Sequence, residues 1–158
     1  MTVLGPLDAM LLRQAIALSA QARDAGDQPY GALLVDADGR VLLEARNTQV
    51  TGRDLSAHAE LNLVRAASPR FDRDTLSACT VYASGEPCAM CAGALYWSGV
   101  GRVVYGLSIE TMTELGGPDA DELLLHCGDV LASGMRPVEV VGTALEAEAR
   151  RVFEDTPR

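Results

Sequence analysis

Thr80-Val-Tyr-Ala-Ser-Gly-Glu-Pro-Cys-Ala-Met-Cys-Ala-Gly-Ala-Leu-Tyr-Trp97 is the stretch that decides the fold of this 158-residue chain. Its first four residues predict a short buried strand, and residues 84–87 predict a turn. A helix containing residues 88–97 is expected to begin at Pro87 and to end near Gly99. A strand, a tight turn and a helix in this order are typical of a layered α/β protein.

The segments on both sides continue the alternation of strands and helices. Two apolar runs, 31–35 and 41–45, are joined by a turn that ends in Asp38-Gly39, and they predict a β-hairpin. Ser56 is expected to cap the helix that follows. The other expected elements are helices over 7–23, 57–67 and 144–153, strands over 100–105 and 138–141, and a helical region over 109–127 that is broken at 116–118. We therefore expect one α/β domain spanning residues 1–158.

Composition limits the class of protein. Apolar residues make up 48% of the chain, enough for a sizeable core. The net charge is −9 and all 13 basic residues are arginines, which weighs against a nucleic-acid binder with a basic face. Aromatic residues make up 4%, too few for a surface that stacks single-stranded bases. The sequence therefore favours a small-molecule partner over a nucleic acid.

The sequence also indicates where the protein acts. It has no run of about 18 apolar residues, so no membrane-spanning helix is expected. Residues 1–12 lack the basic start and the small-residue cleavage site of a signal peptide. We expect a cytoplasmic protein, in which cysteines are thiols or metal ligands rather than disulfides.

Two of the four cysteines have a spacing that suits a metal. Cys88 and Cys91 lie three residues apart at the start of a predicted helix, on one face. His58, at the start of another predicted helix, is the third candidate ligand. Three protein ligands leave one tetrahedral position open, as catalytic zinc requires. A fourth ligand would make the site structural; His126 and Cys127 are candidates, but their spacing does not favour them.

A carboxylate accompanies these ligands. Glu60 follows His58 by two residues and can reach the same pocket, where it can move protons to and from water. A Cys-x-x-Cys pair alone is a common core filler. His58-Ala-Glu60, then 26 residues, then Pro87-Cys-Ala-Met-Cys91 matches the combined pattern of zinc deaminases, in which the glutamate is not a ligand.

At these residues the chain resembles the cytidine deaminase-like superfamily, and within it the branch of guanine, cytosine and tRNA adenosine deaminases. The resemblance extends from Pro29-Tyr-Gly-Ala-Leu-Leu-Val35 to Gly101-Arg-Val-Val-Tyr-Gly106. It implies a three-layer α/β/α fold with a mixed five-stranded sheet, and a homodimer. It also implies that His58, Cys88 and Cys91 hold one Zn²⁺, that Glu60 shuttles protons, and that Asn47 hydrogen-bonds the base.

The resemblance suggests further substrate contacts. Tyr30 belongs to the first matching segment, and Tyr96-Trp97 resembles the guanine deaminase subgroup, so Tyr30 and Trp97 are expected to contact substrate. Glu110 falls closest to an acidic substrate-binding residue of that subgroup. An exposed glutamate at a helix start is an equally good interpretation of Glu110. Glu86 is expected to cap the cysteine-bearing helix, and Cys79 and Cys127 to be buried thiols.

The sequence thus predicts a zinc-dependent aminohydrolase acting on a free nucleobase or related amino-heterocycle, with guanine, converted to xanthine and ammonia, favoured. Cytosine, a nucleoside or tRNA adenosine remain alternatives within the same chemistry. A zinc-stabilised binding module without turnover is the alternative from another class. Glu60 speaks against it, because a structural zinc site has no use for a carboxylate that is not a ligand.

Overall fold

The computed structural model describes residues 4–155 and contains a five-stranded sheet in the order β2-β1-β3-β4-β5. β1 pairs antiparallel with β2 and β3, whereas β3, β4 and β5 run parallel. The strands are β1 (Gly31–Val35), β2 (Val41–Arg46), β3 (Thr80–Gly85), β4 (Arg102–Leu107) and β5 (Glu139–Val141). The expected mixed five-stranded sheet is confirmed. The ends of the expected domain, residues 1–3 and 156–158, lie outside the described residues.

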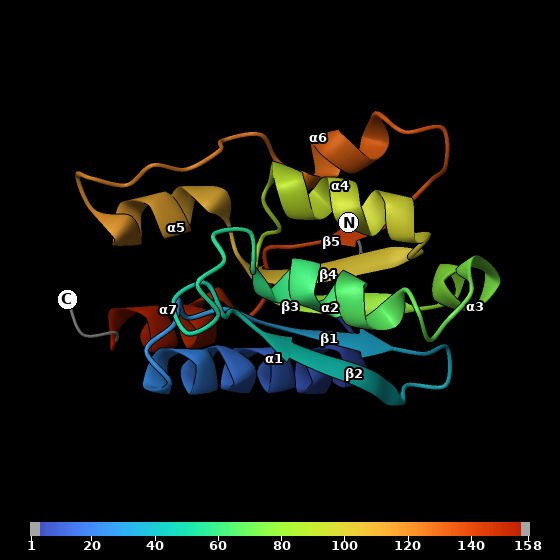
Figure 1. Cartoon of the computed structure of the whole chain (residues 1–158), viewed down its shortest axis with the longest axis horizontal. Coiled ribbons are helices and arrows are strands. Elements are labelled where there is room, and N and C mark those ends of the chain that lie inside the picture. Colours follow the sequence, from blue (N-terminus) through green and yellow to red (C-terminus); the bar gives the residue numbers. More distant parts are fainter. Residues whose placement is uncertain (1–3, 156–158) are drawn as a thin grey trace.

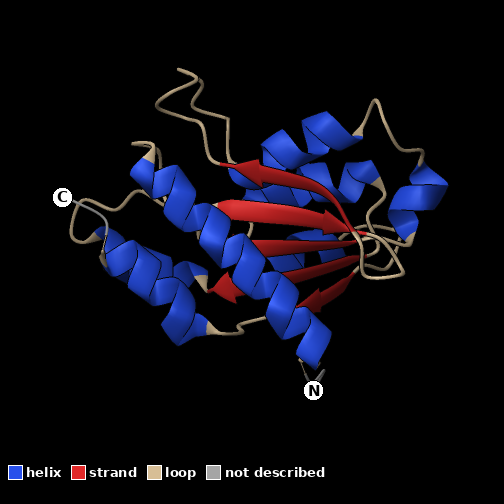
Figure 2. Cartoon of the chain, turned by 90° about the horizontal axis from the view of Figure 1, so that it is seen from below, coloured by secondary structure: helices blue, strands red, loops and turns tan. Residues whose placement is uncertain are grey.

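Helices cover both faces of the sheet, which gives three layers (Figures 1 and 2). One face carries α1 (Pro6–Asp24) and α7 (Glu146–Glu154), and Ile109 and Met112 of α5 (Ile109–Gly116) join the same core. The other face carries α2 (Ala59–Ala67), α3 (Arg73–Ser77), α4 (Ala89–Ser98) and α6 (Cys127–Ala132). Within residues 4–155, no helix combines the length and apolar character needed to cross a bilayer.

Strand β1 lies inside the sheet, between β2 and β3, and its sequence is a continuous apolar run. All five of its residues are buried. Leu33 and Val35 belong to the core under α1, whereas Ala32 and Leu34 belong to the core under α2 and α4. Successive side chains of a strand point to opposite faces, so a strand covered on both faces must be apolar throughout.

One edge of the sheet gathers four chain segments. Gly31 at the start of β1 pairs with Arg46 at the end of β2, so residues 28–30 and 47–49 meet there. The parallel strands β3 and β4 also end there, with Gly85 opposite Leu107. The carboxyl ends of parallel strands are where α/β folds commonly bind ligands. The residues that follow β2, β3 and β4 therefore converge on this edge.

Three local expectations are wrong. Ser56 does not cap α2; its hydroxyl donates to Asp54, and His58 is the N-cap residue. Pro87 precedes the N-cap of α4, Cys88, instead of occupying the first helical position. The expected break at 116–118 is present, but the second helical piece expected before residue 127 is wrong, because residues 117–126 form no helix and α6 begins only at Cys127. Gly117, at φ 77°, ends α5, and Pro118 cannot continue it.

Candidate active site

Three side chains from the starts of two helices meet at the edge of the sheet where β3 and β4 end. His58 is the N-cap of α2, Cys88 is the N-cap of α4, and Cys91 lies in the first turn of α4. The His58 Nδ1 atom lies 3.6 Å from the Sγ atom of Cys88 and 3.6 Å from that of Cys91. Donor atoms of all three residues lie within 4.8 Å of one another. The structure thus brings together the three residues that the sequence predicted as metal ligands.

The donor spacing fits a tetrahedral zinc ion. Zinc lies about 2.3 Å from thiolate sulfur and about 2.0–2.1 Å from imidazole nitrogen, which places nitrogen and sulfur about 3.5 Å apart at a tetrahedral angle. The observed separations of 3.6 Å agree with this value. His126 is not part of this group, because it clusters with Glu86 and Glu110. The set of one imidazole and two sulfurs leaves a fourth coordination position open.

The pKa values of the two cysteines are shifted in opposite directions. The hydrogen bond from Cys91 is the largest cause that lowers the pKa of Cys88 to about 4, and His58 lowers it further. The pKa of Cys91 lies far above its ordinary value, because Cys91 donates to the Cys88 thiolate and is itself buried. The start of α4 also favours negative charge. The site therefore already holds a thiolate at neutral pH, which is the form that binds metal.

Glu60 lies beside these ligands, in the first turn of α2. Its exposed fraction is 6%, and burial raises its pKa to about 7, with repulsion from Cys88 adding to the effect. A carboxyl group that titrates near neutral pH can both accept and release a proton. Glu60 also lines the same cavity as His58 and Cys88. The arrangement suits a proton carrier next to a metal ion.

A cavity with a volume of ≈ 360 Å³ joins the metal ligands to more distant side chains. Its wall contains four carboxyl residues, which give it an acidic character: Glu60, Glu86, Asp121 and Glu122. The remaining lining residues include Gln28, Tyr30, Gln49, Met112, Gly116, Ala120 and Phe153. The prediction that Tyr30 lies at the substrate site agrees with its position on this wall.

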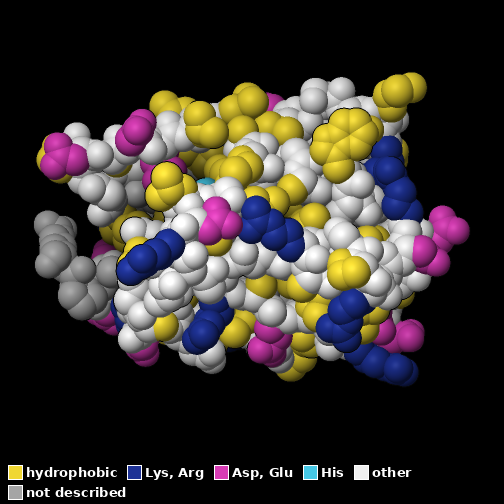
Figure 3. All heavy atoms as spheres, viewed as in Figure 1, with side chains coloured by type: hydrophobic (Ala, Val, Ile, Leu, Met, Phe, Trp, Pro, Cys, Tyr) yellow, Lys and Arg dark blue, Asp and Glu magenta, His cyan; other side chains and the backbone are white. Residues whose placement is uncertain are grey.

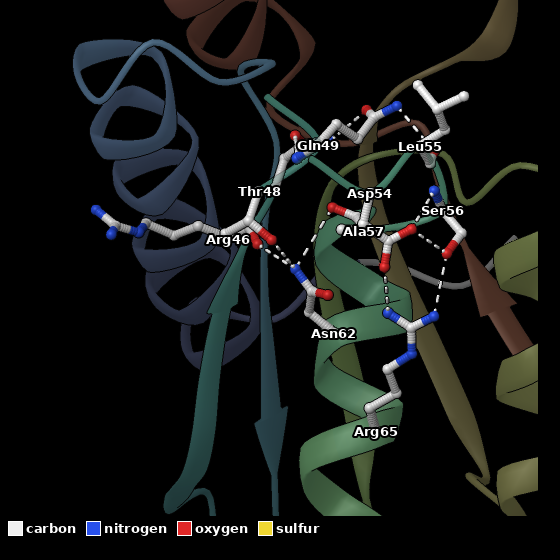
Figure 4. Close-up of polar contacts among 10 residues, drawn as sticks. Arg46, Thr48, Gln49, Asp54, Leu55, Ser56, Ala57, Asn62 and Arg65 are labelled. Atoms are coloured by element: carbon white, nitrogen blue, oxygen red, sulfur yellow. Dashed lines mark hydrogen bonds and ion pairs between the residues drawn. The ribbon is translucent and has the colours of Figure 1, made fainter. Parts of the chain in front are cut away.

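The loop between β2 and α2 is held firmly against α2 (Figure 4). The Asn62 side-chain amide donates to the carbonyl oxygen of Arg46 and to the hydroxyl of Thr48, each at 2.9 Å. Arg65 donates to the carboxylate of Asp54 at 3.3 Å. Because these contacts tie both ends of the loop to the helix that carries the imidazole ligand, the loop enters the cavity in a defined conformation.

Asn47 lies at the start of this loop, but its amide is already engaged. The Asn47 Nδ2 atom donates to Gln49 Oε1 at 2.7 Å, and Oδ1 accepts from the Gln49 backbone N–H at 3.0 Å. Asn47 is 1% exposed, and Gln49 rather than Asn47 lines the cavity. A second hydrogen bond, from Gln49 Nε2 to the carbonyl oxygen of Leu55 at 3.0 Å, orients the Gln49 amide (Figure 4). Asn47 therefore positions Gln49 on the cavity wall.

Glu110 and Trp97, which the sequence predicted as substrate contacts, do not line this cavity. Trp97 is 74% exposed and packs edge-on against Tyr96. It lies six residues after Cys91, about 9 Å along the axis of α4. The Glu110 side chain is 65% exposed and contacts His126 Nε2 at 2.9 Å. Glu110 is therefore an exposed glutamate in the first turn of α5, and its contact with substrate stays a prediction.

Sequence reasoning missed several cavity residues. Gln49 lies two positions after Asn47, a predicted substrate contact, so the sequence did indicate that this loop reaches the site. Asp121 and Glu122 lie in the irregular segment 117–126, and Phe153 lies in α7. Burial raises the pKa of Glu122, and the nearby Cys88 adds to the effect. No spacing rule links these three residues to His58, because only the folded chain brings them there.

Glu86 has a different role from the expected one. Its carboxylate accepts from the backbone N–H groups of Ile109 and Cys127, the first residues of α5 and α6. It therefore caps those two helices and not α4. Cys79 and Cys127 are 1% and 0% exposed, as expected of buried thiols.

The sequence and the structure of the chain are similar to those of known deaminases. The family model for the cytidine and deoxycytidylate deaminase zinc-binding region matches residues 7–107. A probable cytosine deaminase from Schizosaccharomyces pombe is 40% identical over 150 residues, covering 94% of this chain and 91% of that protein. The guanine deaminase of Bacillus subtilis is 36% identical over 110 residues, covering 69% of this chain and 70% of that protein. The structure of guanine deaminase from Nitrosomonas europaea superposes with a TM-score of 0.76 at 25% identity, covering 99% of this chain and 86% of that chain. The chain therefore belongs to the cytidine and deoxycytidylate deaminase family of zinc-binding proteins, and it is a hydrolytic deaminase with zinc as its cofactor.

Proposed function

We propose that the substrate is a free nucleobase or a related amino-heterocycle, with guanine preferred. The observation that carries this proposal is the acidic cavity of ≈ 360 Å³, which joins Glu60 and the metal ligands to Asp121 and Glu122. A cavity of this size suits a small molecule. Carboxylates accept hydrogen bonds from ring N–H and amino groups, which amino-heterocycles display at their edges.

Guanine is preferred because it offers its N1–H and its amino group as adjacent donors, which one carboxylate accepts as a pair. The sequence offered Glu110 for this role, with an exposed helix-start glutamate as an equal alternative, and the position of Glu122 on the cavity wall supports Glu122 for it. Cytosine is the second candidate, because the relative that is 40% identical over 150 residues is described as a probable cytosine deaminase. Gln49 lines the cavity, where its bonds to Asn47 and to the Leu55 carbonyl hold its amide, and a bond from this pair of amides to the base stays part of the proposal.

In the proposed reaction, His58, Cys88 and Cys91 hold one zinc ion, which supplies a Lewis acid that lowers the pKa of water. Glu60 accepts a proton from the attacking water and passes it to a ring nitrogen of the base. As the water oxygen bonds to the ring carbon that bears the amino group, Glu60 carries the second proton of that water to the amino group, and the carbon–nitrogen bond breaks to release ammonia. A pKa of about 7 suits a group that alternates between these two states.

The same observations support proposals about partners. The net charge of −9 and the carboxylates of the cavity repel a polyanion, so we propose that no nucleic acid binds. Exposed apolar side chains gather over α4, α6 and the adjoining segments (Figure 3), and they support a homodimer. They include Met90, Trp97, Leu124, Leu125 and Met135. We also retain the proposal of a cytoplasmic location.

Ammonia release from guanine, cytosine, adenine, their nucleosides and amino-pterins tests the proposal directly. Guanine should give the highest kcat/KM, and Glu122→Gln should lower it by about 10- to 100-fold, the usual effect of losing a hydrogen bond to a charged group. Glu110→Gln is the matched control, and its kcat/KM should stay within about twofold of wild type, because its carboxylate faces outward. Faster turnover of cytosine would transfer the assignment to cytosine. Ammonia release from none of these compounds would refute the small-molecule proposal.

A further inference from the structure

Glu86 is an unusual carboxylate in this structure, because it is buried yet has no arginine partner among the described residues. Its side chain is 1% exposed. Oε2 accepts from the Ile109 N–H at 3.0 Å, and Oε1 accepts from the Cys127 N–H at 3.0 Å. His126 Nδ1 lies 3.0 Å from Oε1 as well. Three hydrogen bonds and two helix starts thus compensate for the burial of the charge.

These bonds close both ends of one segment. Ile109 begins α5 and Cys127 begins α6, so the carboxylate fixes the chain immediately before and after residues 110–126. Within residues 118–125 of the described chain, one backbone–backbone hydrogen bond forms, from the Ala120 N–H to the Gly117 carbonyl. Leu123, Leu124 and Leu125 are more than half exposed and contribute little packing. Residues 110–116 are also held by α5 and by the burial of Met112, so it is the conformation of residues 118–125 that depends on the two anchored ends.

The anchored segment forms one wall of the cavity. Met112, Gly116, Ala120, Asp121 and Glu122 all line the space that His58, Cys88 and Glu60 line from the other side. Glu86 lies two residues before Cys88, and its own N–H donates to the Leu107 carbonyl at 2.7 Å. The short stretch 86–88 therefore has two effects. It positions the metal ligand Cys88, and its Glu86 carboxylate holds the cavity wall that faces this ligand.

We propose that Glu86 is a positioning residue for substrate binding: its buried carboxylate ties the starts of α5 and α6 together and holds the wall formed by residues 110–126 at its distance from the metal ligands. This inference rests on the proposed function in one respect, namely that the wall contacts substrate. Glu86 itself transfers no proton in this proposal. Its loss should weaken substrate binding more than it slows the chemical step, because Glu60 and the three metal ligands lie on α2 and α4.

Glu86→Gln tests the proposal with little change in side-chain volume. Glutamine keeps one acceptor, and its NH₂ group faces the other backbone N–H, so one of the two anchors is lost. Amide hydrogen exchange in peptides covering 109–127 should accelerate by about tenfold or more, whereas peptides from α2 and β3 should exchange as in the wild type. KM should rise by about tenfold with kcat within about threefold, and zinc content should be unchanged.

Asp72→Ala is the matched control, because the Asp72 carboxylate caps α3 in the same manner, at 2.8 Å from the Thr75 N–H, without lining the cavity. It should lower thermal stability and leave KM unchanged. If Glu86→Gln behaves like Asp72→Ala, with a lower melting temperature and an unchanged KM, Glu86 serves stability alone and the proposal is wrong. Unchanged exchange over 109–127, or loss of zinc, would also overturn it.

His126→Ala keeps the test possible if Glu86→Gln does not fold. It removes one of the three bonds to the carboxylate and leaves both backbone anchors, so faster exchange should be confined to the hydrogen-bonded amides of Ala120 and Cys127. Exchange there at the wild-type rate would contradict the proposal. If the wild-type protein releases ammonia from no compound tested, the proposed function fails, while the exchange measurements still decide whether Glu86 holds the wall.

Discussion

Replacement of Glu60 by glutamine separates proton transfer from every other property of the site. Glutamine has nearly the same shape but neither takes up nor releases a proton at neutral pH. Loss of a positioned acid–base group costs about 10²- to 10⁴-fold in rate. Since one carboxyl group serves the water, the ring nitrogen and the leaving group, we expect a fall in kcat of about 10⁴-fold, which is about 5 kcal/mol of barrier. Zinc content should be unchanged, because His58, Cys88 and Cys91 remain.

The same substitution should stabilise the metal-free protein at alkaline pH. Burial raises the pKa of Glu60 from 4.5 to about 7, so the folded protein binds a proton that the unfolded chain releases. Stability therefore falls as pH rises from 4.5 and levels off above about 7, by a total of about 3 kcal/mol. Glu60→Gln lacks this loss, so its stability relative to wild type should grow over that range.

Urea unfolding of both metal-free proteins at about pH 4.5 and about pH 8 measures this difference, and ammonia release with zinc analysis of the same preparations measures the rest. A stability difference that does not change with pH would refute the buried-carboxyl argument. Turnover by Glu60→Gln within about tenfold of wild type would mean that another group moves the protons. Loss of zinc would make Glu60 a ligand or its support.

Three further predictions concern the metal, nucleic acid and His126. The purified protein should hold about one zinc per chain, and Cys91→Ala should lose metal and activity together; full zinc occupancy in that variant would contradict the ligand assignment. A tRNA anticodon stem-loop should bind no better than about 10⁻⁴ M at physiological salt, so micromolar, salt-sensitive binding in a filter or anisotropy assay would argue against a free base. The pKa of His126 is raised above 6.5 by its hydrogen bond with Glu86 and by the charges of Glu86, Glu110 and Asp129. Protonated His126 therefore stabilises the folded protein fully below pH 6.5, and this stabilisation is lost as the pH rises through the pKa of the folded state. The melting temperature of the wild type should therefore fall more between about pH 6 and pH 9 than that of His126→Gln, and parallel curves would show that His126 does not contribute.

The parts of the fold that the sequence predicts well are those with a local physical signal. The hairpin of β1 and β2 follows from two apolar runs and an Asp38-Gly39 turn, in which Gly39 adopts φ 82°. The start of α4 follows from a strand that ends in Gly-Glu-Pro before the cysteines. The metal ligands could be predicted for the same reason, because each lies at a helix start that the sequence marks.

The substrate side of the cavity has no such local signal. Glu110 was the natural candidate because it follows β4 directly, yet its side chain turns toward His126 and solvent. Glu122 lies twelve residues further on, in a segment whose three consecutive leucines fit neither a helix nor a strand period. Its place at the cavity depends on the buried Glu86 carboxylate, a contact between residues 23 and 41 positions apart along the chain.

The cavity is built from two parts of the chain, one inside and one outside the region that the family model matches. This explains why membership of the family determines the reaction but does not determine which base reacts. The family model covers residues 7–107 and ends with the last residue of β4. That part carries the metal ligands, Glu60 and Gln49, whereas Met112, Asp121, Glu122 and Phe153 all follow it. Relatives described as cytosine, guanine and tRNA-specific adenosine deaminases are 36–40% identical to this chain. We therefore expect the wall after β4 to contribute to the choice of base, together with Gln28 and Tyr30 on the family-matched side, and we propose that Glu86 holds that wall in place.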